Sequence, residues 1–133
     1  MVARPVDLES EPSVLVADDS SAWRRAVVDV LRRAGFRTLQ AGDGEEAVDV
    51  VRTELLDLVL VDFHMPRLDG IETVRHIRRH DQHLPAVMMT ARPAELPVVE
   101  IRRLRIAMVL PKRGVDRRRI VSAVRMNLRP KSA

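Results

Sequence analysis

The stretch LVLVDFHMPRLDG, residues 58–70, runs from four apolar residues directly into an aspartate, Asp62. An apolar run without alternation is typical of a β-strand that is buried on both faces, as in a parallel sheet. A proline and a glycine follow within eight residues and indicate a turn. A carboxylate at the end of a buried strand costs free energy unless another group neutralises it. The stretch therefore predicts a buried strand and a charged partner for Asp62.

The sequence on either side alternates short apolar runs with segments of helical spacing. Strands are predicted over 13–18, 37–41, 56–62, 85–90 and 107–110, and helices over 20–36, 45–54, 69–80, 94–105 and 116–128. The helix over 94–105 is the weakest of the five, because Pro93 and Pro97 crowd its start. Strands that alternate with helical crossovers predict an α/β domain, with a parallel sheet covered by helices on both faces.

Length and composition predict one globular domain. The chain has 133 residues, of which 46% are hydrophobic, and no cysteine, which excludes disulfides and thiolate metal sites. We expect a flexible polar leader over 1–12, the domain over 13–128 and a frayed tail over 129–133. Neither a secretory signal nor an apolar run of the ~20 residues that a membrane span needs is visible, so we expect a cytoplasmic protein without a membrane partner.

The positive charge of the chain comes almost entirely from arginine. The net charge is +4, with 21 arginines against 2 lysines. Eight arginines come in four scattered pairs, which we expect on exposed helix faces, and aromatic residues make up only 2% of the chain. We therefore do not expect this domain to bind nucleic acid. Lys112 is the only lysine in the body of the domain, which suggests that a compact ammonium group is needed there.

Polar and charged residues stand at the carboxyl ends of the predicted strands. The first strand ends in Asp18-Asp19, the third in Asp62 and the fourth in Thr90, while the fifth runs into Lys112. In an open parallel sheet these ends meet at one edge, where ligands bind. We therefore expect three carboxylates, one hydroxyl and one ammonium group to converge there.

Three neighbouring carboxylates repel one another, and a hard divalent cation relieves that repulsion. Mg²⁺ takes oxygen ligands and keeps several waters, so one or two carboxylates suffice to hold it. Together with Lys112, the cation would neutralise the oxygens of an incoming phosphoryl group. The constellation fits an aspartate, Asp62, that accepts a phosphoryl group in the presence of Mg²⁺.

Four segments together resemble the receiver domain of two-component response regulators: VLVADDS, LVLVDFHMPRLDG, VMMTA and VLPK. The resemblance runs from about Ser13 to Leu128. It implies a doubly wound, flavodoxin-like fold with a five-stranded parallel sheet of order 2-1-3-4-5 and five helices. It also implies a signalling domain, not an enzyme, that is phosphorylated on Asp62 by a sensor histidine kinase or a histidine phosphotransfer protein. We expect no output domain in this chain.

The resemblance also implies roles for the individual residues at the strand ends. Asp19 and Asp62 would bind Mg²⁺ directly, Asp18 would hold it largely through water, and the backbone carbonyl of His64 would complete the protein ligands. His64 would then have an exposed side chain.

Two further roles follow from the same resemblance. Lys112 would contact the phosphoryl group, and Thr90 would turn its hydroxyl onto a phosphoryl oxygen. A downstream protein partner would then bind the face formed by the fourth helix, the fifth strand and the fifth helix.

Two residues and one four-residue segment depart from the usual receiver pattern on the output side. Val109 stands where many receivers have Phe or Tyr, Arg113 where a proline usually follows the lysine, and RIAM replaces the usual Gly-Ala turn before the fifth strand. We expect signalling without coupling between Thr90 and an aromatic residue, through movement of the proline-rich fourth helix at Pro97.

Several alternatives remain open at this stage. Asp18 and Asp19 are also suited to cap the following helix, and threonine is common at strand ends, so Thr90 has a purely structural alternative. The whole chain has two: a receiver fold that binds proteins without phosphorylation, and a basic nucleic-acid binder that uses Arg117 to Arg119 and Arg125.

Overall fold

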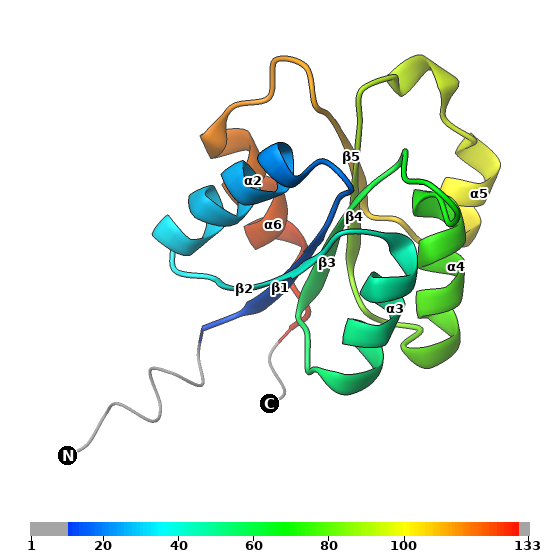
Figure 1. Cartoon of the computed structure of the whole chain (residues 1–133), viewed down its shortest axis with the longest axis horizontal. Coiled ribbons are helices and arrows are strands. Elements are labelled where there is room, and N and C mark those ends of the chain that lie inside the picture. Colours follow the sequence, from blue (N-terminus) through cyan, green and yellow to red (C-terminus); the bar gives the residue numbers. More distant parts are fainter. Residues whose placement is uncertain (1–10, 131–133) are drawn as a thin grey trace.

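A computed structural model describes residues 11–130, and its centre is a parallel sheet of five strands. The sheet has the order β2-β1-β3-β4-β5, which confirms the predicted doubly wound arrangement (Figure 1). The strands are β1 (Ser13–Ala17), β2 (Arg37–Ala41), β3 (Leu58–Asp62), β4 (Ala86–Thr90) and β5 (Met108–Pro111). The helices are α2 (Ser21–Arg33), α3 (Gly44–Thr53), α4 (Gly70–His80), α5 (Val98–Arg103) and α6 (Arg117–Asn127), with a 3₁₀ turn, η1, at Pro93–Glu95.

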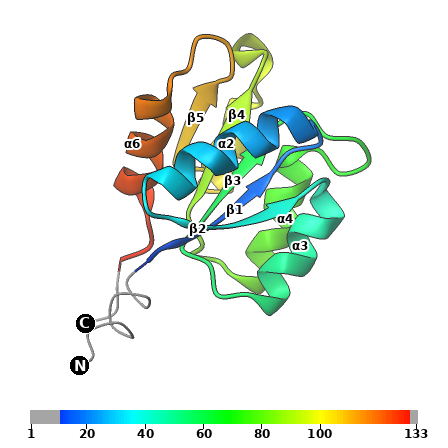
Figure 2. The ribbon, with the colours of Figure 1, turned by 60° about the vertical axis from the view of Figure 1, so that its left-hand side comes forward.

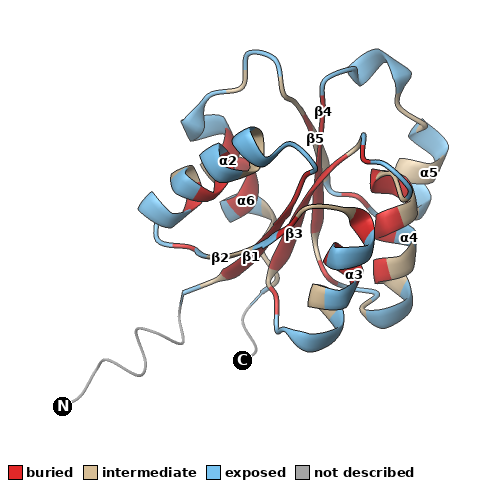
Figure 3. Ribbon diagram, in the orientation of Figure 1, coloured by how far each residue is buried: buried red, intermediate tan, exposed pale blue. Residues whose placement is uncertain are grey.

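The three central strands, β1, β3 and β4, are buried along their whole length. Helices cover both faces of the sheet: α2 and α6 lie on one face, and α3, α4 and α5 lie on the other (Figures 1 and 2). Alternate residues of each strand point to opposite faces, so the interior divides into two apolar clusters. The buried residues follow this division, with red inner surfaces and pale outer surfaces on most helices (Figure 3).

Side chains that bind backbone N–H groups fix where the longer helices begin. Ser20, Asp43, Asp69 and Asp116 are the N-caps of α2, α3, α4 and α6, and each accepts a hydrogen bond from the backbone three residues on. Asp69 and Glu72 form a complete capping box at the start of α4. These caps lie in the loops that follow β1, β2, β3 and β5 at the carboxyl edge of the sheet.

The predicted helix over 94–105 is wrong in its length. The structure has the turn η1, then a break at Pro97, and then α5 with only six residues. Neither start has a side-chain cap, and the proline ring supplies no N–H group with which to continue a helix from the turn. Val98 and Val99 in the first turn of α5 are both 63% exposed.

Arg78 of α4 holds the C-terminal end of α5. The Arg78 guanidinium group donates to the carbonyl oxygens of Leu104 at 2.8 Å and Leu84 at 2.6 Å. Arg105, which replaces the first residue of the usual Gly-Ala turn, has φ +55°, in the left-handed region that favours glycine. This end of α5 is therefore fixed by side-chain bonds and a tight turn.

The expectation that paired arginines lie on exposed faces holds for six of the eight paired arginines but is wrong for Arg24 and Arg78, which are half-buried. The expected leader (1–12) and tail (129–133) lie largely outside the described residues. Among residues 11–130, no helix has both the length and the apolar character that crossing a membrane requires.

Candidate functional site

Asp62 is the last residue of β3 and is only 5% exposed. The turn after it is tight, because the Gly70 N–H donates to the Phe63 carbonyl at 2.8 Å. A Cβ atom at Gly70 would lie 2.5 Å from the Asp62 carbonyl oxygen, so only glycine fits there. The stretch that defines the strand thus also holds the aspartate in place.

Asp18 and Asp19 follow β1, the neighbouring strand. Asp18 is buried and accepts a hydrogen bond from the Ser20 N–H through Oδ1 at 2.9 Å, whereas Asp19 is exposed. Neither of them caps α2, since its N-cap is Ser20. The structural alternative for this pair of acids is therefore removed.

Lys112 joins the two buried carboxylates. Its Nζ lies 2.8 Å from Asp18 Oδ2 and 3.2 Å from Asp62 Oδ1, and its side chain is 18% exposed. The ammonium group also lies 5.4 Å from the centre of the Trp23 ring, within the range of a cation–π contact. Lys112 is thus held from α2, β1 and β3 at once.

Burial and the neighbouring charges together raise the pKa of Asp62 from its ordinary 3.8 to about 6. Burial is the main cause and the nearby Asp18 carboxylate the second, while Lys112 lowers the pKa but does not compensate. One ammonium group is therefore not enough positive charge for this group of acids.

The three carboxylates lie close enough together to share one cation. One oxygen from each of Asp18, Asp19 and Asp62 lies within 4.8 Å of the others. Oxygen ligands alone, with an open side at the exposed Asp19, suit a hard cation such as Mg²⁺ that keeps part of its water. The residues present fit the metal that the sequence predicts.

Thr90 and His64 lie at the same edge of the sheet. Thr90 is fully buried at the end of β4, and its Oγ1 accepts a hydrogen bond from the Arg92 N–H at 2.9 Å. The Thr90 carbonyl accepts from the Lys112 N–H at 2.7 Å, which ties the ends of β4 and β5 together. The side chain of His64 is exposed, as expected.

One residue at the site has no signal in the sequence. Arg24 of α2 donates to the Asp18 carbonyl at 2.7 Å and to the Gln40 side chain at 3.0 Å. It therefore connects the loop after β1 to β2. Helical spacing places Arg24 on the surface, and only the fold shows that a strand end lies within its reach.

A family model described as the response regulator receiver domain matches residues 14–125. The chain belongs to the receiver domain family of response regulators. Receiver domains are signalling modules of two-component systems, and as a family they bind Mg²⁺ at an acidic pocket. They interact with histidine kinases and phosphotransfer proteins.

Curated relatives of the receiver are proteins of different kinds. The chain is 40% identical over 88 residues to the transcriptional regulatory protein AfsQ1 of Streptomyces coelicolor, covering 66% of the chain and 39% of AfsQ1. It is 36% identical over 78 residues to sporulation initiation phosphotransferase F of Bacillus subtilis, covering 59% and 63%. With chemotaxis protein CheY-3 of Vibrio cholerae it shares 34% over 96 residues, covering 70% and 74%.

Solved structures of receivers have the same fold. CheY4 of Vibrio cholerae gives a TM-score of 0.84 at 25% identity, covering 90% of this chain and all (100%) of that one. CheY in the CheX-CheY-BeF3-Mg²⁺ complex of Borrelia burgdorferi gives 0.80 at 27% identity, covering 86% and 87%.

Proposed function

We propose that this receiver is switched by Mg²⁺-dependent phosphorylation of Asp62. The observation that carries the proposal is the convergence of three carboxylates and Lys112 at one edge of the sheet. A buried carboxylate with a raised pKa and too little positive charge around it is suited to a divalent cation, which would also neutralise the oxygens of an incoming phosphoryl group. A CheY of similar structure is described in a complex with BeF3 and Mg²⁺.

The hydrogen bonds of the three aspartates support different modes of binding to the metal. Both oxygens of Asp18 already have partners, the Ser20 N–H and Lys112 Nζ, so Asp18 would hold Mg²⁺ largely through water. Asp19 and Asp62 would bind it directly, with the His64 carbonyl as a further ligand. When bound, the metal supplies positive charge to the oxygens of the phosphoryl group.

In the proposed transfer a carboxylate oxygen of Asp62 attacks phosphorus, and the bond from phosphorus to the donor's histidine nitrogen breaks. The electron pair of that bond stays on the nitrogen, and the product is an acyl phosphate on Asp62. Lys112 is close enough to both buried acids to turn from Asp62 to a phosphoryl oxygen while it keeps Asp18. The donor would be a sensor histidine kinase or a histidine phosphotransfer protein.

The proposed response begins at Thr90. Its hydroxyl oxygen accepts the Arg92 N–H, so its own proton is free to be donated to a phosphoryl oxygen. A turn of this side chain would release the Arg92 backbone and the η1 segment that follows it. The face formed by α5, β5 and α6 would then meet a downstream protein, without an aromatic residue at Val109.

The test is incubation with Mg²⁺ and acetyl phosphate, followed by intact-mass measurement of the wild type and of Asp62→Asn. Asp49→Asn, on the exposed side of α3, is the matched control. We expect one phosphoryl group on the wild type and on the control, none on Asp62→Asn, and none when EDTA replaces Mg²⁺.

A phosphoryl gain that persists in Asp62→Asn would show that another residue is the acceptor. No gain in the wild type, together with no Mg²⁺-dependent change in Trp23 fluorescence, would favour a receiver fold that binds proteins without phosphorylation. Mg²⁺ binding without a gain would be followed by the same experiment with a phosphorylated histidine phosphotransfer protein, and failure there would refute the proposal.

A further inference from the structure

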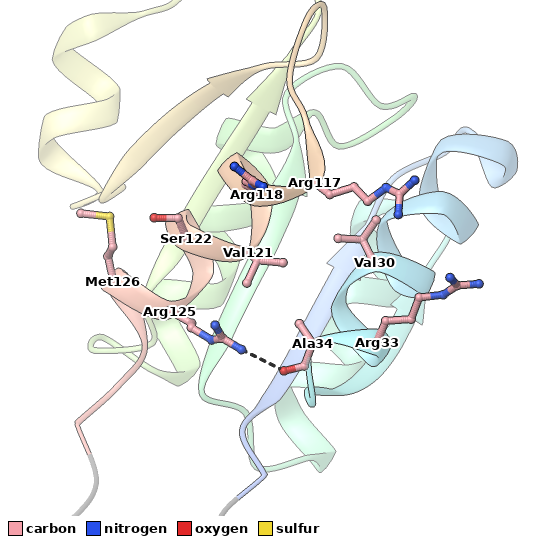
Figure 4. A pocket seen from close by; sticks show the side chains of 9 residues that line it. All are labelled: Val30, Arg33, Ala34, Arg117, Arg118, Val121, Ser122, Arg125 and Met126. Atoms are coloured by element: carbon pink, nitrogen blue, oxygen red, sulfur yellow. Dashed lines mark hydrogen bonds between the residues drawn. The ribbon is translucent and has the colours of Figure 1, made fainter.

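A groove of about 530 Å³ lies between the last turns of α2 and the outer side of α6 (Figure 4). It lies on the face of the sheet opposite α3 and α4, and none of its lining residues belongs to the carboxylate cluster. What it binds is therefore a question separate from phosphorylation of Asp62.

The floor of the groove is apolar. Val30 and Ala34 of α2 and Val121 of α6 line it and are half-buried, and Figure 4 shows the two valines pointing toward each other across it. Met126 stands at one end with 69% of its surface exposed. Burial of apolar surface is favourable by about 25 cal/mol per Å², and a flexible thioether adapts to different partners. The floor is suited to apolar side chains of another molecule.

The rim of the groove is basic. Four arginines line it, Arg33, Arg117, Arg118 and Arg125, and no carboxylate does. Arg33 is paired with Asp29 at 3.1 Å, and Arg125 donates to the Ala34 carbonyl at 3.0 Å. Within residues 11–130, no carboxylate lies within ion-pair distance of Arg117 or Arg118. The rim therefore carries positive charge that is not neutralised by its neighbours.

The apolar floor and the basic rim together favour one kind of binding partner over two others. A second copy of the chain would bring the same four arginines face to face, and like charges across an interface disfavour association. Nucleic acid would be attracted by the rim, but an apolar floor without aromatic rings gives bases nothing to stack on. An amphipathic helix with acidic flanks satisfies both the floor and the rim.

We propose that the groove between α2 and α6 docks an amphipathic, acidic helix of a partner protein. The groove follows α6, which has 11 residues and is therefore about 16 Å long at a rise of 1.5 Å per residue. A partner helix of about three turns matches this length, with apolar residues at i, i+3 or i+4, and i+7 on the floor. Its glutamates or aspartates would pair with Arg117 and Arg118.

The probe is a fluorescent, helix-stabilised peptide of about three turns with leucines at these positions and glutamates elsewhere. Binding is followed by anisotropy at physiological salt and is mapped by amide chemical shifts of the labelled protein. We expect affinity in the micromolar range, with shifts concentrated over residues 30–34 and 117–126. A peptide with lysine in place of glutamate should bind at least about tenfold more weakly.

Two kinds of variant locate the site. Arg117→Glu with Arg118→Glu reverses the free rim charges and should weaken binding by at least about tenfold. Ser122→Trp, an exposed position on the edge of the groove, fills it without a change of charge and should weaken binding similarly. The matched control is Arg79→Glu with Arg102→Glu, two exposed arginines of α4 and α5, which should change affinity less than about twofold.

Several results would overturn the proposal. If both pairs of charge reversals weaken peptide binding equally, the binding reflects only general attraction between charges. If no peptide binds at millimolar concentration, the groove is not a docking site for an acidic helix. Tighter binding of a short DNA duplex that is lost in Arg117→Glu with Arg118→Glu would assign the patch to nucleic acid. A concentration-dependent dimer by light scattering that Ser122→Trp abolishes would assign it to a second copy.

Discussion

Replacing Asp62 by asparagine is expected to stabilise the metal-free protein at neutral pH. Burial and the Asp18 carboxylate raise the pKa of Asp62 from 3.8 to about 6, so ionised Asp62 costs the folded state free energy. At about 1.4 kcal/mol per pKa unit, this rise corresponds to about 3 kcal/mol, which is an upper limit for the gain. The variant loses the Lys112 contact at 3.2 Å. We therefore expect a gain of about 1–3 kcal/mol in the free energy of unfolding.

The sign follows from protonation. Because the pKa in the folded state is the higher one, the contribution of Asp62 to stability is fully present below the unfolded pKa of about 3.8 and is lost as pH rises through about 6. The gain from Asp62→Asn should therefore be complete at about pH 8 and absent near pH 3.5. Urea unfolding in EDTA, followed by fluorescence of the chain's one tryptophan, Trp23, measures it at both pH values.

Mg²⁺ reverses the order of the two proteins if the carboxylates bind it. A ligand that binds only the folded state raises its stability with the logarithm of ligand concentration, so the wild type should gain and Asp62→Asn should gain little. Asp49→Asn, the exposed control, should follow the wild type in every condition. The reasoning is refuted if Asp62→Asn is less stable than the wild type in EDTA at about pH 8, or if its effect is the same at both pH values.

Three further changes test the supports of the site by the same unfolding measurement. Gly70→Ala should cost about 2–4 kcal/mol, because its Cβ would meet the Asp62 carbonyl, whereas Gly42→Ala, with nothing nearer than 3.6 Å, should cost less than about 1. Equal costs would contradict the close approach. Lys112→Met should cost about 2–4 kcal/mol near pH 8, since it leaves buried carboxylates without a cation, and much less near pH 4; a cost independent of pH would refute this. Asp69→Ala should cost about 1–2 kcal/mol and Asp69→Asn little, and a negligible cost for Asp69→Ala would show that the capping box contributes nothing.

Much of the fold could be predicted because the pattern of hydrophobic residues determines where the strands lie. The five strands are short apolar runs, and all five were found within one or two residues of their observed bounds. The ends of these runs also predicted which side chains would share one edge, since parallel strands bring their carboxyl ends together. The site residues from Asp18 to Lys112 are therefore found where the pattern placed them.

The pattern was insufficient where side chains bind the backbone of distant segments. Arg24 and Arg78 occupy positions that helical spacing assigns to solvent, yet each donates to carbonyl groups brought close only by the tertiary fold. The length of α5 was misjudged for a related reason. Prolines indicate that a helix is disfavoured, but they do not say whether it continues, and here Pro97 separates a 3₁₀ turn from a six-residue helix.

The two ends of α5 are held unequally. The C-terminal end is fixed at Leu104, whereas the N-terminal end is free of side-chain bonds to its backbone. Arg78 of α4 donates a hydrogen bond to the Leu104 carbonyl, and Arg105 with its positive φ forms a tight turn directly after it. The opposite end has no side-chain cap and begins eight residues after Thr90, beyond the turn η1. In the proposed response, a displacement at Thr90 would therefore move the uncapped end of α5 most, at the exposed Val98 and Val99. In the proposed response, the short α5 would take the place of an aromatic side chain at Val109 on β5 in carrying a change from the carboxylates to the surface.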